Sequence, residues 1–246
     1  MFNFLKSKSD LKIKPTSEKR LEQALVKAGI KNPASVKKLT VTGEVTIDDF
    51  KFIRKKMGKT LQILDMSRAL FEENKLRRGA FSNCTALTSI TLPALTTEIG
   101  DGAFKNCAGL ASLTIPNAVT RIGELAFWGC TGLTSVSIPD SVVEIAFRAF
   151  NNCSGLTSIV IPHSVVKIAG SAFGMCTSLT SVTIPNSVIE IGNGAFANCT
   201  SLASITIPES VAAIGDWLVR DCDTLVTVHP DNPYYVDEDG KLVKKV

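Results

Sequence analysis

Cysteine is the residue type with the greatest chemical potential in this sequence, because a thiolate can bind zinc, form a disulfide or act as a nucleophile. The seven cysteines stand 23 residues apart without interruption: Cys84, Cys107, Cys130, Cys153, Cys176, Cys199 and Cys222. No two of them have the C-x-x-C spacing of a zinc or redox site, and their odd number leaves at least one unpaired.

Apolar residues flank these cysteines at fixed distances. Each cysteine lies three residues before a leucine, and the first six lie three residues after a phenylalanine, as in Phe196, Cys199 and Leu202. Such a position belongs to a core, where free cysteine behaves as a small hydrophobe. We therefore predict a column of buried, reduced thiols, with disulfides or a metal as the alternative.

Other groups suited to catalysis are scarce. The two histidines, His163 and His229, have no nucleophile or metal-binding motif beside them, and the glycines form no phosphate-binding loop. The acidic run 237–239 lacks the alternating ligands and distal Glu of an EF-hand loop, so a turn is predicted there. The sequence therefore predicts a protein that is not an enzyme, with no cofactor and no metal site.

The period of the cysteines is shared by the rest of each unit. Within 199–215, Leu202, Ile205 and Ile207 form a short alternating strand, Pro208 ends it, and Val211 and Ile214 supply a second apolar edge. A period of roughly 20 to 50 residues is the signature of a solenoid, in which one unit cannot fold without its neighbours.

The consensus A-F-x-x-C-x-x-L-x-x-I-x-I-P-x-x-V-x-x-I-G resembles the treponemal and BspA-like class of leucine-rich repeats over about residues 79–230. The resemblance implies an α/β repeat solenoid: a curved, right-handed leucine-rich repeat solenoid with a parallel β-sheet on its concave face and an N-terminal helical cap. It implies protein–protein contact, including adhesion to host matrix proteins in some family members, and no shared enzymatic activity.

The sequence outside these units suggests how the solenoid is closed. Residues 36–41 and 61–66 repeat the strand skeleton in degenerate form, and between them Thr46 and Asp49 predict a capped helix that ends at Gly58. A further helix is expected from Ser17, with Leu21, Ala24, Leu25 and Ala28 on one face. The predicted organisation is 1–35, tail and capping helix; 36–78, degenerate rungs; 79–230, solenoid; and 231–246, capping hairpin.

Charge is divided unevenly along the chain. Residues 1–78 hold 19 Lys and Arg against 9 Asp and Glu, whereas 79–246 hold 8 against 14. Because the basic residues are scattered and few aromatics accompany them, we favour a solvated surface over an anionic partner and predict no nucleic-acid binding.

The destination of the chain is left open by the sequence. No apolar run reaches the roughly 18 to 20 residues that span a bilayer, and the first residues make a poor export signal. These features and the unpaired cysteines favour the cytoplasm, whereas the family resemblance favours a surface or secreted location.

The outward residues of the strands form the first candidate binding surface. They are uncharged and small, and we single out Ser135, Ser137, Ser158, Val160, Ser181 and Thr183. The alternative is that a crowded concave sheet simply favours Ser and Thr.

Departures from the consensus form the second candidate surface. Trp128 and Phe147 replace small or polar residues of the other units, and with Arg148 and Met175 they predict an exposed binding edge. The alternative is that the two aromatic rings pack on one another. The predicted function is a protein-interaction module with an unidentified protein partner, self-association being open, and the alternative is a surface or secreted adhesin.

Overall fold

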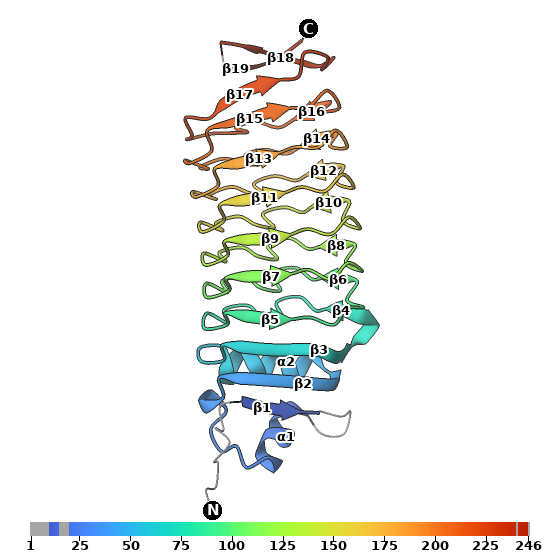
Figure 1. Cartoon of the computed structure of the whole chain (residues 1–246), viewed down its shortest axis with the longest axis vertical. Helices are drawn as coiled ribbons and strands as arrows, with labels where there is room; N and C mark the ends of the chain where they lie inside the picture. The colour runs from blue at the N-terminus through green and yellow to red at the C-terminus, as the bar shows by residue number, and fades with distance from the viewer. Residues whose placement is uncertain (1–9, 15–19, 240, 246) are drawn as a thin grey trace, which may run out of the picture.

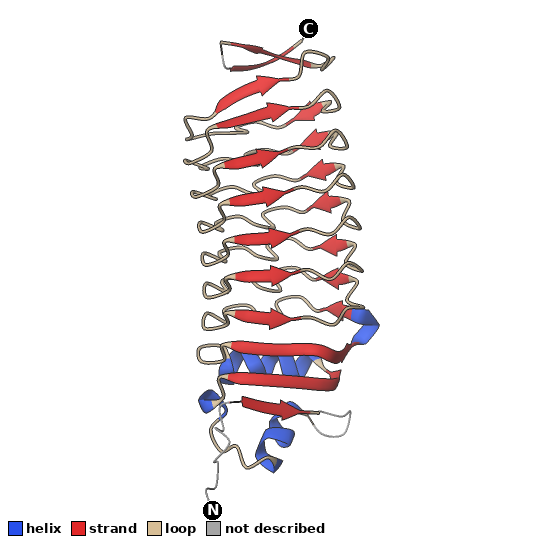
Figure 2. Ribbon diagram, viewed as in Figure 1, coloured by secondary structure: helices blue, strands red, loops and turns tan. Residues whose placement is uncertain are grey.

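The protein is an elongated stack of short turns in which two columns of parallel strands run along its length (Figure 1). The computed structural model describes residues 10–14, 20–239 and 241–245. The predicted repeat solenoid is confirmed, and helices occur near the N-terminal end of the stack (Figure 2). No helix among these residues is long and apolar enough to cross a membrane.

The first column carries the strand that the sequence predicts in each unit. Its strands are β2 (Lys38–Val45), β3 (Ile63–Phe71), β5 (Ser89–Thr91), β7 (Ser112–Thr114), β9 (Ser135–Ser137), β11 (Ser158–Val160), β13 (Ser181–Thr183), β15 (Ser204–Ile207) and β17 (Leu225–Val228). Hydrogen bonding divides them into three parallel sheets, β2 to β5, β7 to β13, and β15 with β17. From β7 to β13 the strands pair at a step of 23 residues, as Ser158 with Ser181 and Ile159 with Val182.

The second column arises from the apolar edge after each proline. Each two-residue strand turns one isoleucine or leucine into the core, and its neighbour on the previous rung lies 23 residues earlier, as Ile122 pairs with Ile99. Its strands are β4 (Lys75–Leu76), β6 (Glu98–Ile99), β8 (Arg121–Ile122), β10 (Glu144–Ile145), β12 (Lys167–Ile168), β14 (Glu190–Ile191) and β16 (Ala213–Ile214).

A column of phenylalanine rings fills the core between the sheets and the turns. The six rings from Phe81 to Phe196 are fully buried, with centroids 5.1–5.6 Å apart and interplanar angles of 5–24°. Phe50 closes the N-terminal end of the stack edge-on, 5.4 Å from Phe81 at an angle of 88°. The aromatic stack therefore runs unbroken from the N-terminal cap to the sixth unit.

The cysteines form the predicted column of free thiols, and six of the seven are buried. Each thiol from Cys107 on donates to the carbonyl oxygen of the phenylalanine 26 residues earlier, at Sγ–O distances of 3.0–3.5 Å. Burial raises the pKa of Cys84, Cys130 and Cys199 to about 12. These thiols are poor nucleophiles, because the thiolate is the reactive form.

The N-terminal end is closed by helices and one additional strand. Helix α2 (Ile47–Phe52), continued by a π-helical turn over Ile53–Met57, has the predicted capping box of Thr46 and Asp49. Buried Asp49 also accepts a hydrogen bond from Leu21 N at 2.7 Å, which ties α1 (Leu21–Lys27) to α2. The expected start of α1 at Ser17 lies outside the described residues.

Two expectations for this end need correction. Ala28 is exposed, because α1 ends at Lys27, so only Leu21 and Leu25 of the predicted face are fully buried. Strand β1 (Asp10–Ile13) was not expected within 1–35, and it pairs in parallel with β2. Its four residues are too few to show a strand period among the neighbouring lysines.

The C-terminal rung departs from the expected register. The sequence pattern aligned Leu225 with the buried leucines and Thr227 with Ser204, but Leu225 pairs with Ser204 and is 53% exposed. The strand has slipped by two residues, so that Val226 fills the core instead.

The expected hairpin follows as β18 (Tyr235–Glu238) and β19 (Lys241–Lys244), which pair antiparallel. Buried Asn232 anchors it: its amide nitrogen donates to Pro208 O and Val211 O, and its amide oxygen accepts from the backbone of Tyr234 and Tyr235.

Removing one ring tests the aromatic column. Phe127→Ala should lower the free energy of unfolding by about 3–5 kcal/mol, because Phe104 and Phe150 would then line a cavity. Urea denaturation measures this loss, with the exposed Ser158→Ala as a control that should stay within about 0.5 kcal/mol. A loss of unfolding free energy no larger than that of the control would show that the stacked rings do not stabilise the core.

Raising the pH tests the buried thiols. Unfolded cysteines ionise near pH 8.5, whereas the buried ones retain their protons, so the unfolded state binds fewer protons and stability falls as the pH rises from about 8.5 toward 12. Each buried thiol contributes a slope of about 1.4 kcal/mol per pH unit. In urea denaturation, Cys153→Ala should reduce the total slope by about that amount, and an unchanged slope would contradict thiol burial.

Candidate interaction surfaces

The six predicted residues of the strand face lie on three neighbouring strands. We use the name strand face for the outward side chains of β5 to β15. Ser135, Ser137, Ser158, Val160, Ser181 and Thr183 are all exposed. In the parallel register, Val160 lies between Ser137 and Thr183 and is 76% exposed. An apolar side chain therefore stands alone in a column of hydroxyl groups.

A groove of about 640 Å³ lies where these strands end. Ser137, Val160 and Thr183 line it together with the prolines that terminate the strands, and Asp140 and the exposed His163 also line it. The structure thus unites three of the six predicted residues in one groove. Ser135, Ser158 and Ser181 form the parallel column beside it and do not line it.

Trp128 and Phe147 lie on the same edge of the stack, connected through the backbone of Leu125. Leu125 N donates to Phe147 O, and Trp128 N donates to Leu125 O, both at 3.0 Å. Each ring has a cation of its own: Lys105 Nζ lies 4.9 Å from the Trp128 ring, and the Arg148 guanidinium lies 4.9 Å from the Phe147 ring. Phe147 is 41% exposed, whereas Trp128 is only partly exposed.

Phe147 borders a second groove of about 540 Å³ along the short strands. The small residues Ala146, Ala169 and Gly170 are among those that line it. A Cβ atom at Gly170 would meet the Phe147 ring at 3.5 Å, so the ring lies over this glycine. The edge therefore combines a half-exposed aromatic ring with an open groove whose lining is both apolar and charged, the latter from Arg121, Glu144 and Lys167.

The turns contain two columns of residues with left-handed backbone, each repeating every 23 residues. Glycine and asparagine, which adopt this conformation at least cost, occupy most of these positions. The bulky exceptions are Leu125, Arg148 and Trp217 in the first column and Met175 in the second. Two of the predicted edge residues, Arg148 and Met175, thus belong to this set, and Met175 is 48% exposed.

Trp217 is a candidate that the sequence analysis missed. It has a φ of 60° and is 63% exposed, and the Arg220 guanidinium lies 5.6 Å from its ring. It borders a groove of about 610 Å³ that also contains Lys241 and Lys244 of the terminal hairpin. Comparison with Gly79, Gly102 and Gly194, which share its column, would have revealed it.

Charged side chains alternate along the short strands, a second feature that sequence reasoning missed. Reading every 23rd residue gives Lys75, Glu98, Arg121, Glu144, Lys167 and Glu190. Arg121 contacts Glu98 at 2.6 Å, and Lys167 contacts Glu190 at 2.9 Å. The hydrogen bond that Lys167 Nζ donates to the Glu190 carboxylate raises the pKa of Lys167. Opposite charges on neighbouring strands favour this register over a slipped one.

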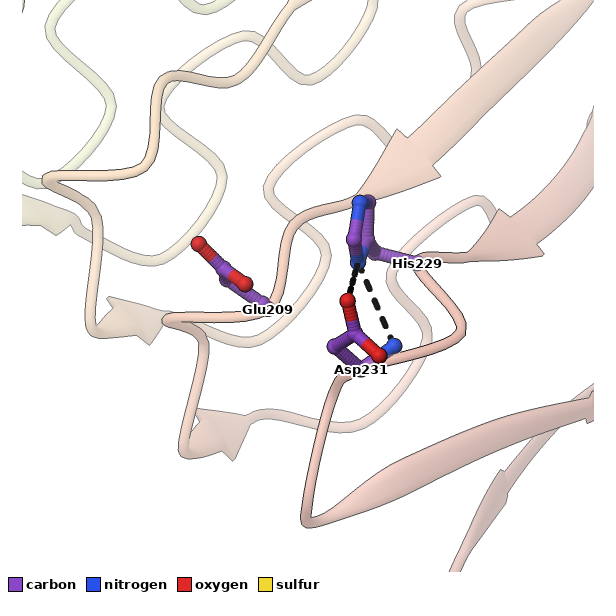
Figure 3. Close-up of side chains that lie close together, drawn as sticks. All are labelled: Glu209, His229 and Asp231. Atoms are coloured by element: carbon purple, nitrogen blue, oxygen red, sulfur yellow. Dashed lines mark hydrogen bonds and ion pairs between the residues drawn. The ribbon is translucent and has the colours of Figure 1, made fainter.

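One mixed group of potential metal ligands is present although the sequence predicts none. Glu209, His229 and Asp231 lie close together beside the last turn (Figure 3). All three are exposed, and one ligand atom of each lies within 4.8 Å of the others.

Comparison with known proteins relates these features to a family. The BspA type leucine rich repeat region matches residues 72–176 and 167–235, in six copies. A leucine-rich repeat protein from Bacteroides ovatus is 30% identical, with a TM-score of 0.63 over 76% of this chain and 47% of that chain. The chain thus spans about half the length of that protein.

A leucine rich repeat protein from T. pallidum is 32% identical, with a TM-score of 0.45 over 57% of this chain and 72% of that chain. The comparison with curated proteins finds no match. The family match covers well over half of the residues, and the matched ranges contain the phenylalanine and cysteine columns described above. The chain therefore belongs to the BspA-type leucine-rich repeat family.

Proposed function

We propose that this chain is a non-enzymatic scaffold that binds a protein partner through two surfaces, the groove beside Val160 and the edge formed by Trp128, Phe147, Arg148 and Met175. The family and the fold support the coarser function of a protein-interaction scaffold. The partner and the contacting residues are the proposal.

The observation that carries the proposal is the presence of large side chains at left-handed backbone positions. A residue with a Cβ atom in this conformation costs about 1–2 kcal/mol, which glycine avoids. Arg148 has a φ of 53° and Met175 a φ of 61°, although other units show that glycine or asparagine suffices for the turn. Unfavourable backbone geometry concentrates at functional sites. We therefore expect the side chains of Arg148 and Met175 to contact the partner.

The edge also has the composition of a binding hot spot. Tryptophan and arginine dominate such sites, and a central aromatic residue next to an open groove supplies a desolvated anchor. Phe147 and its groove provide this arrangement, and Arg148 lies against the same ring. Val160 supplies an exposed apolar side chain on the other proposed surface, the groove of the strand face.

Catalysis has little support in the same surfaces. The buried thiols have raised pKa values, and His163 lies exposed in the groove beside Asp140 and Ser141.

Adhesion to extracellular matrix proteins is the alternative use of the same surfaces, and it rests on the family resemblance. Cell fractionation and protease access on intact cells separate the two.

Replacement of the aromatic pair tests the proposed edge. Trp128→Ser with Phe147→Ser should weaken capture of the partner by about 2 kcal/mol, or about thirtyfold in Kd. Affinity capture from native lysate identifies the partner by mass spectrometry, and titration with the purified partner gives the Kd.

Val160→Thr, which restores the residue type of Thr183, tests the groove separately and should leave the stability of the protein within about 0.5 kcal/mol. Unchanged capture by all variants, with the fold intact, would contradict the proposal.

A second test sets stability against binding. Met175→Asn installs the residue that Asn83, Asn106, Asn152 and Asn198 provide in the same column, so unfolding should become costlier by about 1 kcal/mol while partner binding weakens. Ser171→Gly is the matched control, because it relieves the same backbone conformation without removing a large side chain. It should raise stability and leave binding unchanged. Equal binding by Met175→Asn and the wild-type chain would exclude Met175 from the site.

A further inference from the structure

Three potential metal ligands converge at the C-terminal end of the solenoid. Glu209 follows β15, whereas His229 and Asp231 follow β17, so the group joins the last regular unit to the terminal segment (Figure 3). His229 Nδ1 lies 3.9 Å from Asp231 Oδ2. Ligand atoms about 2.0–2.2 Å from one zinc ion lie a little over 3 Å apart, so small rotations of these exposed side chains would complete a site.

The register slip of the last rung creates this group. Ile207 pairs with Val228, so His229 emerges beside Pro208 and Asp231 comes close to Glu209. With a regular 23-residue step, His229 would align with Thr206 within the strand instead. The other histidine, His163, emerges from a regular unit and has Asp140 one unit earlier in its column.

The electrostatics of the group favour a cation. In the described part of the chain, neither Glu209 nor Asp231 forms an ion pair with a lysine or arginine, and the 3.9 Å contact of Asp231 Oδ2 with His229 Nδ1 is an ion pair only when the imidazole is protonated. Two neighbouring carboxylates repel each other unless a cation lies between them. A divalent metal would remove this repulsion, and a single imidazole with two carboxylates offers the mixed nitrogen and oxygen set that zinc accepts.

A neighbouring group already orients one of the ligands, and a second contact sets the tautomer of another. Asn186 Nδ2 donates to Glu209 Oε1 at 3.1 Å, an outer contact of the kind that holds a metal ligand in position. Asp231 N donates to His229 Nδ1 at 3.3 Å, so Nδ1 carries the lone pair of the ring, and a metal bound at Nδ1 would take the place of this hydrogen bond.

We propose that Glu209, His229 and Asp231 form a binding site for a divalent transition metal of the zinc type, with solvent in the remaining positions. The bound metal links the last regular unit to the segment between β17 and β18 across the slipped rung. Its effect is to stabilise the C-terminal closure of the core, independently of the binding edge near Phe147.

Titration of the chelator-treated full chain with zinc chloride tests the site. We expect one zinc ion per chain by calorimetry, and slower amide hydrogen exchange in β17 and β18 when zinc is bound. His229→Asn should weaken zinc binding at least about tenfold and abolish the slower exchange, since loss of a ligand exceeds the usual effect of an outer contact. Glu209→Gln should also weaken binding, and it keeps the test decisive should His229→Asn not fold.

Two matched controls assign the effect to this site. His163→Asn removes the other histidine, and Cys222→Ser removes the one cysteine that is not buried. Both variants should bind zinc like the wild-type chain. Absence of zinc binding, equal zinc binding by His229→Asn, or loss of binding in Cys222→Ser would each overturn the proposal. Calcium bound as tightly as zinc, and unaffected by His229→Asn, would also overturn it, because an acidic patch alone would then explain the binding.

Discussion

The stacking of one buried ring on the next is the constraint on which the rest of this structure depends. Consecutive rungs of a parallel ladder lie about 4.8 Å apart, and the phenylalanine centroids keep to 5.1–5.6 Å over six units. The thiol of each following unit donates to the carbonyl of the phenylalanine before it. An insertion in any unit would displace a ring, a thiol and a strand together, which explains why the period of 23 never varies between Cys84 and Cys222.

The period changes only where the stack of rings ends. Before Phe81 the strands pair at steps of 25 and 26 residues, as Lys38 with Ile63 and Ile63 with Ser89, and Phe50 meets the stack edge-on from a helix. After Phe196 the column holds Val219, and the next strand pair steps by 21 residues, from Ser204 to Leu225. Because no stacked ring fixes the register before Phe81 or after Phe196, the units at the two ends can differ in length from the regular units. Both caps lie in these irregular units.

The parts of the fold that could be predicted are those in which burial restricts the type of residue. The inward columns, the capping box at Thr46 and the terminal hairpin follow from apolar spacing and known turn chemistry. Strand β1 escaped prediction because pairing with β2 decides its conformation. The slip at Leu225 was hidden because Val226 and Val228 are as apolar as the residues that they replace. Trp217 was missed because a left-handed backbone produces no periodic pattern of apolar residues. Its trace in the sequence is the glycine that other units have at the same position.

Function in such a molecule must use positions that the stack does not constrain. The inward columns are restricted to buried apolar residues, so polar and large exposed differences among units can accumulate only on the strand face, in the turns and at the ends. The turns near Phe147 and Met175 depart from the consensus in the middle of the stack, where both neighbouring units hold the backbone rigid. Rigid support lowers the entropic cost of presenting large side chains to a partner. Beyond β17 a hairpin takes the place of a further regular unit, and the proposed metal site would add a crosslink at this end of the stack.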